Sequence, residues 1–242
     1  MSAFVCSAES LRPLYNAITR HHCPSALAAS GSRCRRVSDK RSRLDACMAG
    51  SVPMIHESRF WKNDLLKSAL SLERRLSQQR WSDGTFADVE KRVMLGFYAI
   101  RKLIEAKKID DELANQSVSL TTYKSTGKPV TRINWHHYWE LYDLDSPQSS
   151  TLRVLLVCHQ FVHSYVFGFS FSETRDLVSI LVSSDREKNR VLYEIKVVEL
   201  IRLFREIGQN YPTEYHASFN DKKGDYDVVV KTSKLKRSTS KG

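Results

Sequence analysis

The amino-acid sequence predicts an α+β fold, with an N-terminal antiparallel helical hairpin packed with a small antiparallel sheet and further helices. Two long amphipathic patterns come first, between residues 60 and 104. Three strand-like segments follow later with short connections, which favours local antiparallel pairing over alternating parallel units. At 242 residues, 41% of them hydrophobic, the chain can bury one core, so we expect a single α+β domain over residues 55–230.

Residues 1–53 are expected to be a disordered or non-native N-terminal extension. They are rich in Ala, Ser, Arg and Cys and show no sustained hydrophobic period. They fit a basic arm, a transit peptide or upstream sequence translated from an early start, and we favour the last because amphipathic order begins directly after Met54. Four of the five cysteines lie here at spacings that fit no zinc pattern. We therefore expect no disulfide framework and a cytoplasmic protein.

The two long patterns predict a helix over residues 60–81 and a second helix that reaches Ile104. A turn is expected at Ser82-Asp83-Gly84, with Thr85 as the N-cap of the second helix. Because few residues separate them, the helices should pack antiparallel. The apolar stripes are Trp61, Leu65, Ala69, Leu72 and Leu76 in the first helix, and Phe86, Val89, Val93, Phe97, Ile100 and Ile104 in the second.

The strand-like segments come mainly from the second half of the chain. Residues 117–124 alternate and predict a first strand, and Asn134 can cap a short helix over residues 135–142. Residues 167–171, 177–183 and 190–197 predict a three-stranded meander, and residues 198–207 predict a last helix. Residues 225–231 are either an edge strand or irregular, and residues 231–242 predict a basic disordered tail.

The stretch from Ser149 to Phe171 is the most apolar in the chain and carries its most reactive side chains. Asp145-Ser146-Pro147 provides capping oxygens and a proline suited to a first turn, so a helix is expected to begin there. Its buried face should contain Leu152, Leu155, Leu156, His159, Val162 and Val166. The pattern changes to a period of two around Gly168, where the chain should enter a strand.

The net charge of +11 is concentrated at the two ends of the chain. Residues 1–50 contribute +5, residues 231–242 contribute +5, and the remaining 180 residues contribute only +1. A folded domain that reads a duplex carries a basic face of its own. Nucleic acid is therefore expected only as a partner of the basic tails. The apolar runs are shorter than the roughly 18 residues of a spanning helix, so no membrane partner is expected.

A metal site is the most specific chemical hypothesis. His159 and His163 are four residues apart, which on a helix allows two imidazoles to share one zinc or similar divalent ion. Further ligands would come from His136, His137 or Glu140, and His137 and Glu140 are chosen because residues three apart can share a helix face. Gln160 stands where a metalloprotease helix has its general base. The alternative, which we favour, is that the histidines only satisfy hydrogen bonds in a half-buried core, with no cofactor.

Two other groups of residues have a functional and a structural interpretation. Cys158 is a candidate nucleophile, but its Val/Leu surroundings favour a buried inert thiol. Trp135, Tyr138 and Trp139 can line an aromatic surface or pocket, although packing in a core or interface is favoured. We expect an interaction or regulatory domain without catalysis, with protein as its partner. A metal-dependent enzyme and tail-driven nucleic-acid binding are the alternatives.

Overall fold

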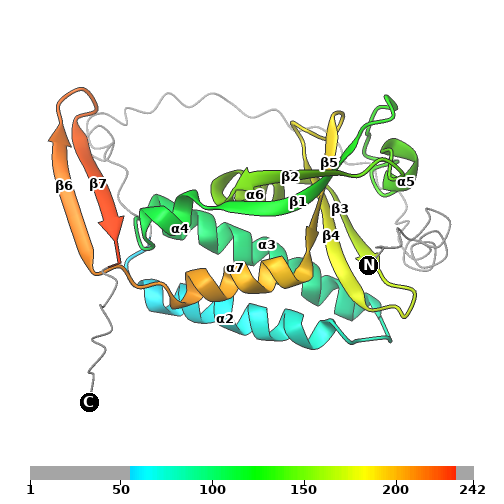
Figure 1. The fold of residues 1–242 in the computed structure, drawn as a ribbon, viewed down its shortest axis with the longest axis horizontal. Helices are drawn as coiled ribbons and strands as arrows, with labels where there is room; N and C mark the ends of the chain where they lie inside the picture. The colour runs from blue at the N-terminus through cyan, green and yellow to red at the C-terminus, as the bar shows by residue number, and fades with distance from the viewer. Residues whose placement is uncertain (1–54, 233–242) are drawn as a thin grey trace, which may run out of the picture.

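The computed structural model describes residues 55–232, and it confirms the α+β class (Figure 1). The predictions for residues 1–53 and for nearly all of the 231–242 tail lie outside the described residues. Among the described residues, no helix is both long enough and apolar enough to cross a membrane. The helices are α2 (Ser58–Arg75), α3 (Asp83–Glu105), α4 (Asp111–Asn115), α5 (Tyr138–Leu141), α6 (Val154–Val162) and α7 (Val197–Gln209). The strands are β1 (Ser117–Lys124), β2 (Gln148–Arg153), β3 (Ser164–Phe171), β4 (Leu177–Ser184), β5 (Val191–Lys196), β6 (Glu214–Asn220) and β7 (Asp225–Lys231).

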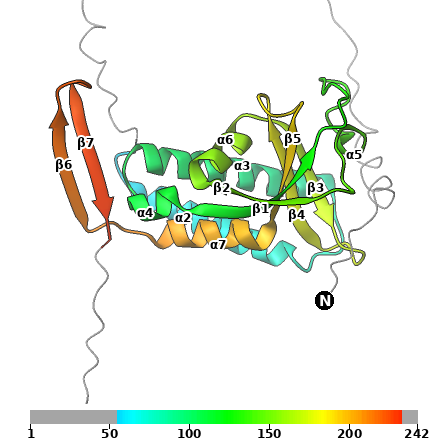
Figure 2. The same ribbon diagram turned by 45° about the horizontal axis from the view of Figure 1, so that its top comes forward.

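Five of the described strands form one antiparallel sheet in the order β2-β1-β5-β4-β3. The predicted meander is confirmed as β3-β4-β5, and the predicted strand at residues 117–124 is β1. Strands β6 and β7 pair only with each other and form a separate hairpin at one end of the molecule (Figures 1 and 2). Residues 225–231 are therefore a strand, but they are not an edge of the main sheet.

The helices α2 and α3 follow each other as predicted, but α2 packs more extensively along α7 than along α3. Close approach of α2 and α7 depends on Gly208, because a Cβ atom there would lie 2.8 Å from the side chain of Leu66. Helix α7 follows β5 without a loop, so the chain returns from the sheet directly onto the helical layer. The contact between α2 and α7 could not be predicted from the sequence pattern, because the two helices are far apart in the chain.

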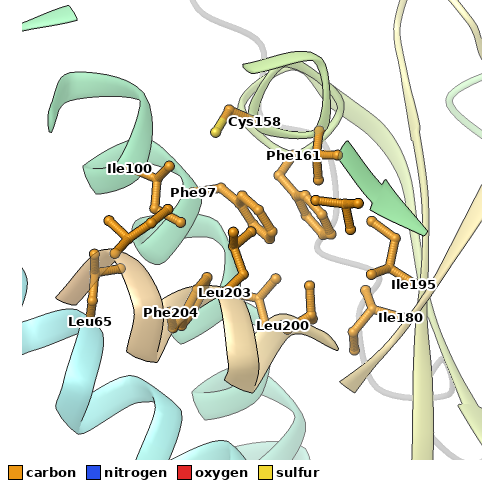
Figure 3. Close-up of a cluster of buried hydrophobic side chains, with 14 of the residues drawn as sticks. Leu65, Phe97, Ile100, Cys158, Phe161, Ile180, Ile195, Leu200, Leu203 and Phe204 are labelled. Atoms are coloured by element: carbon orange, nitrogen blue, oxygen red, sulfur yellow. The ribbon is translucent and has the colours of Figure 1, made fainter. Parts of the chain in front are cut away.

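The main core lies between the helices and one face of the sheet (Figure 3). Its centre is aromatic: the ring of Phe97 stacks on that of Phe161 with centroids 4.1 Å apart and meets Phe204 edge-on at 5.5 Å. These three rings come from α3, α6 and α7 and are all buried. Offset and edge-on aromatic pairs add to the free energy gained by burying apolar area. The core therefore joins three helices that are far apart in sequence.

The prediction for the central stretch is partly wrong. Residues 148–153 form β2, which pairs with β1 and places Leu152 beside Val118, and the helix begins only at Val154. The backbone N–H and C=O groups of residues 148–153 form hydrogen bonds with β1 instead of the hydrogen bonds of a helix. The buried face is also different, since Leu155 and Leu156 are exposed and Val154, Val157, Cys158 and Phe161 are buried. In so uniformly apolar a helix, the pattern alone leaves the orientation undetermined.

Two local boundaries also differ from the prediction. Ser82, not Thr85, is the N-cap of α3, and its Oγ accepts a hydrogen bond from the Thr85 N–H at 3.3 Å, so Asp83 and Gly84 belong to the first helical turn. The helix expected over residues 135–142 is only the single turn α5. Instead of capping a helix, the Asn134 side chain accepts a hydrogen bond from the Thr131 N–H at 2.7 Å and stabilises a turn.

Candidate functional site

His159 and His163 lie at the end of α6 with their ring centroids 4.7 Å apart. Nη1 of Arg101, on α3, lies 3.2 Å from Nε2 of His163. A guanidinium only donates hydrogen bonds, so Nε2 of His163 is the acceptor in this contact. Burial lowers the pKa of His159, and nearby His163, Arg186 and Arg101 lower it further. His159 is half-buried and His163 is exposed, so the pair lies at the rim of the core and not within it.

The structure does not bring the four predicted metal ligands together. The buried side chains of α6 belong to the main core, whereas those of α5 belong to a second cluster. Leu181 is in the second cluster while its neighbours Ile180 and Val182 are in the main core, so the two clusters cover opposite faces of the sheet. His137 and Glu140 are therefore on the face opposite α6. Within residues 55–232, no group of three or more His, Cys, Asp or Glu side chains is placed to hold a metal ion.

The aromatic patch forms a second, smaller core on the outer face of the sheet. Tyr138 is buried, its hydroxyl donates to the carbonyl of Phe169 at 3.3 Å, and its ring fills the space that a Cβ at Gly168 would occupy. Trp135 and Trp139 are half-buried and pack against this cluster. The patch thus packs against this face of the sheet.

The thiol of Cys158 is fully buried in the main core. Burial raises its pKa to about 12, so the thiol stays protonated at neutral pH. A protonated thiol enclosed by apolar side chains is a poor nucleophile. The burial expected from its Val/Leu neighbours is confirmed.

A buried lysine, which the sequence pattern did not reveal, joins the ends of three helices. The side chain of Lys62 on α2 is fully buried, and its Nζ donates to the carbonyls of Lys108 at 2.7 Å and Asn210 at 2.5 Å. The ammonium also lies 4.1 Å from the ring centroid of Tyr211. Burial first, and then the charge of Lys108, lower its pKa to about 8. Because both acceptors are main-chain carbonyls, Lys62 holds the ends of these helices together.

A groove of about 480 Å³ runs between α2 and α3. Its apolar lining includes Trp61, Leu65 and Leu95, and Leu95 is 56% exposed. The charged residues on its rim are Asp64, Lys67, Asp88, Lys91 and Arg92. Two ion pairs along the rim join residues within one helix, Asp64 to Lys67 at 3.1 Å and Asp88 to Arg92 at 2.9 Å. The groove therefore offers an apolar strip with little net charge.

The β6–β7 hairpin carries a second exposed surface, which we call the hairpin face. Directly opposed residues of an antiparallel pair lie on the same side, and the register pairs Tyr215 with Val230, Ala217 with Val228 and Phe219 with Tyr226. All six of these side chains are apolar or aromatic. Tyr215, Phe219 and Tyr226 are 55%, 55% and 59% exposed, whereas Val230, at the base of the hairpin, is buried.

The opposite side of the hairpin is mostly polar. It pairs Glu214 with Lys231, His216 with Val229, Ser218 with Asp227 and Asn220 with Asp225. The hairpin is thus amphipathic, and among residues 55–232 its apolar side is covered only at the base. Period-two alternation in residues 215–219 and 226–230 was the signal that could have identified it.

Comparison with family models, with curated proteins and with solved structures finds no match to this chain.

Proposed function

We propose that this chain is a protein-interaction domain without a catalytic role, and that the hairpin face is the surface that contacts the partner. The observation that carries the proposal is the exposure of three aromatic side chains, Tyr215, Phe219 and Tyr226, on one side of a hairpin that projects from the body (Figures 1 and 2). Exposed apolar surface of this kind marks sites of association, and aromatic residues dominate the energy of protein interfaces.

The charge of the hairpin supports a protein partner over a nucleic acid. Residues 214–231 contain four acidic side chains and three lysines, so their formal charge is −1. Aromatic side chains that stack on nucleic-acid bases are normally accompanied by a basic groove that follows the phosphates. Here the tip carries Lys222 and Lys223, but Asp225 and Asp227 follow directly, and Asp227 pairs with Lys223 at 2.5 Å. A polyanion therefore gains little from this surface.

Neighbouring valines on β7 provide a matched test. Val228 is on the hairpin face, whereas Val229 is on the polar side and is 44% exposed. A photo-crosslinking residue is placed at 226 or at 216 in the full chain, and the partner linked at 226 is identified and purified. We expect Val228→Ser and Phe219→Ser to weaken binding of that partner roughly tenfold or more, and Val229→Ser to leave it nearly unchanged.

The thermal stability of each variant must match wild type, so that lost binding is not lost folding. Equal crosslinking from positions 226 and 216, or equal effects of Val228→Ser and Val229→Ser, would contradict the proposal. A partner bound instead in the α2–α3 groove would respond to Leu95→Glu but not to Leu70→Glu, an exposed leucine of α2 outside the groove lining.

A further inference from the structure

We infer that the hairpin also joins two copies of this chain, through antiparallel pairing of β6 with β6 of a second copy about a two-fold axis at Ala217. The inference rests on the proposed function, because it takes the hairpin as the docking element and names one of its occupants. It concerns the edge of the hairpin, whereas the partner proposed above binds the hairpin face.

The outer edge of β6 has no neighbouring strand among the described residues. Within the part of the chain that the structure describes, β6 pairs with no strand other than β7, and it is the outermost labelled element at that end of the molecule (Figures 1 and 2). The other edge of the hairpin is occupied, because the Val230 N–H on β7 donates to Oδ2 of Asp111 on α4 at 2.9 Å. A second strand can therefore approach the hairpin along β6 and not along the base of β7.

The backbone of β6 presents donors along this edge. The Val230 N–H points away from β6, so Val230 and Tyr215 form a pair without mutual hydrogen bonds. Because the two kinds of pair alternate along an antiparallel ladder, the N–H groups of Tyr215, Ala217 and Phe219 also point outward. Three donors at every second residue are the arrangement that an added antiparallel strand requires.

The edge lacks the features that normally prevent such pairing. Exposed edge strands are usually short, or carry lysines, prolines or bulges. Strand β6 is seven residues long and pairs with β7 in an unbroken register. Its sequence, EYHASFN, has one charged residue, Glu214, at its end. This edge is therefore open to a strand of suitable sequence.

The sequence of β6 suits a second copy of itself. A two-fold axis at Ala217 is the only centre that pairs all seven residues of the strand. It places Tyr215 opposite Phe219 of the second copy, an aromatic cross-strand pair, and Glu214 opposite Asn220. His216 is then opposite Ser218, so no two like charges face each other. This register also keeps both hairpin faces on the same side.

The result is a four-stranded sheet in the order β7-β6-β6-β7, with one continuous apolar side. A two-stranded hairpin is only marginally stable in water, whereas three or more strands with a hydrophobic face are stable. Pairing therefore stabilises the hairpin and doubles the surface offered to the partner of the proposed function. The interface is isologous, so it closes as a dimer and does not propagate.

Symmetry supplies the test, because only the residue on the two-fold axis meets its own copy. Ala217→Cys is introduced into the full chain, which is oxidised, digested and searched by mass spectrometry. We expect a disulfide between two copies of residue 217. Ser218→Cys is the matched control: its two copies would be roughly 8 Å apart at Cα, which is beyond disulfide reach. Equal linkage at 217 and 218 would overturn the inference.

Sedimentation of the uncrosslinked full chain over a wide concentration range provides the second measurement. We expect wild type to dimerise, and Ala217→Pro to weaken the dimer roughly tenfold or more by removing the central outward N–H of each strand. Tyr226→Ser, which changes the face and not the edge, should leave the dimer intact. A monomeric wild type, or a dimer lost equally in both variants, would overturn the β6 pairing. Partner binding by a monomer would refute this inference alone, and a dimer that binds no partner would refute only the proposed function.

Discussion

The close contact between Gly96 and Phe204 leads to a prediction that opposes helix propensity. A Cβ atom at residue 96 would lie 2.3 Å from Cζ, 2.6 Å from Cε2 and 3.2 Å from Cε1 of Phe204. The ring cannot move aside easily, because Phe204 is fully buried and meets Phe97 edge-on. Overpacking of this severity costs about 3 kcal/mol, whereas alanine in place of glycine in a helix gains about 1 kcal/mol. Gly96→Ala should therefore lower the free energy of unfolding by about 2 kcal/mol.

Urea unfolding of the full chain, followed by circular dichroism, measures this difference, and the melting temperature should fall by roughly 4 to 8 °C. Gly84→Ala is the matched control in the first turn of the same helix, where the nearest atom to an added Cβ is Ser82 Oγ at 3.9 Å. The control should be neutral or more stable by up to about 1 kcal/mol. If Gly96→Ala were as stable as Gly84→Ala, the packing of α7 against α3 would be wrong.

Two further predictions concern titratable side chains. His163→Gln should lower the free energy of unfolding by less than about 1 kcal/mol, because Nε2 of His163 accepts from Arg101 in an exposed contact. The stability of this variant should not change when a chelator is added. A stoichiometric metal lost from both His159→Gln and His163→Gln would contradict this prediction. Lys62 has a pKa of about 8 in the folded protein and 10.5 when unfolded, so between these values the unfolded chain binds more protons and the free energy of unfolding rises with pH. Urea titrations at several pH values should show the free energy of unfolding of wild type rising by roughly 2 to 3 kcal/mol between these two pKa values, relative to Lys62→Met. If the free energies of unfolding of the two proteins changed in parallel with pH, the role of Lys62 would be refuted.

Elements with a clear period and sharp ends could be predicted from the sequence. The stripe from Val89 to Ile100 predicts the buried side of α3, because polar residues on the opposite side determine its orientation. Strand β1 matches its predicted limits because alternating residues are bounded by polar turns. In both cases the information is local: the covered side differs in composition from the exposed side within a few residues.

The orientation of α6 and the neighbours of α2 could not be predicted in this way. The residues of α6 are apolar on nearly every side, so burial of Val157 and Phe161 instead of Leu155 depends on which side α3 occupies. The contact of α2 with α7 similarly depends on Gly208, far along the chain, whose missing Cβ permits close approach. The four proposed metal ligands do not lie together for the same reason. The face of the sheet on which each of them lies depends on strand register, which their spacing in the sequence does not reveal.

The hairpin face shows a different limit of sequence patterns. Alternation in residues 215–219 and 226–230 identifies a side rich in apolar residues, and in a typical antiparallel sheet that side is covered by the rest of the chain. Here Val230, at the base of the hairpin, is buried, whereas Phe219 and Tyr226, near its tip, are exposed. The same pattern thus describes a core strand or a docking surface, and only the position of the hairpin beyond α4 separates the two. An apolar face that its own fold leaves open is stabilised most by association, which is why we place the interaction surface there and not in the histidine pair.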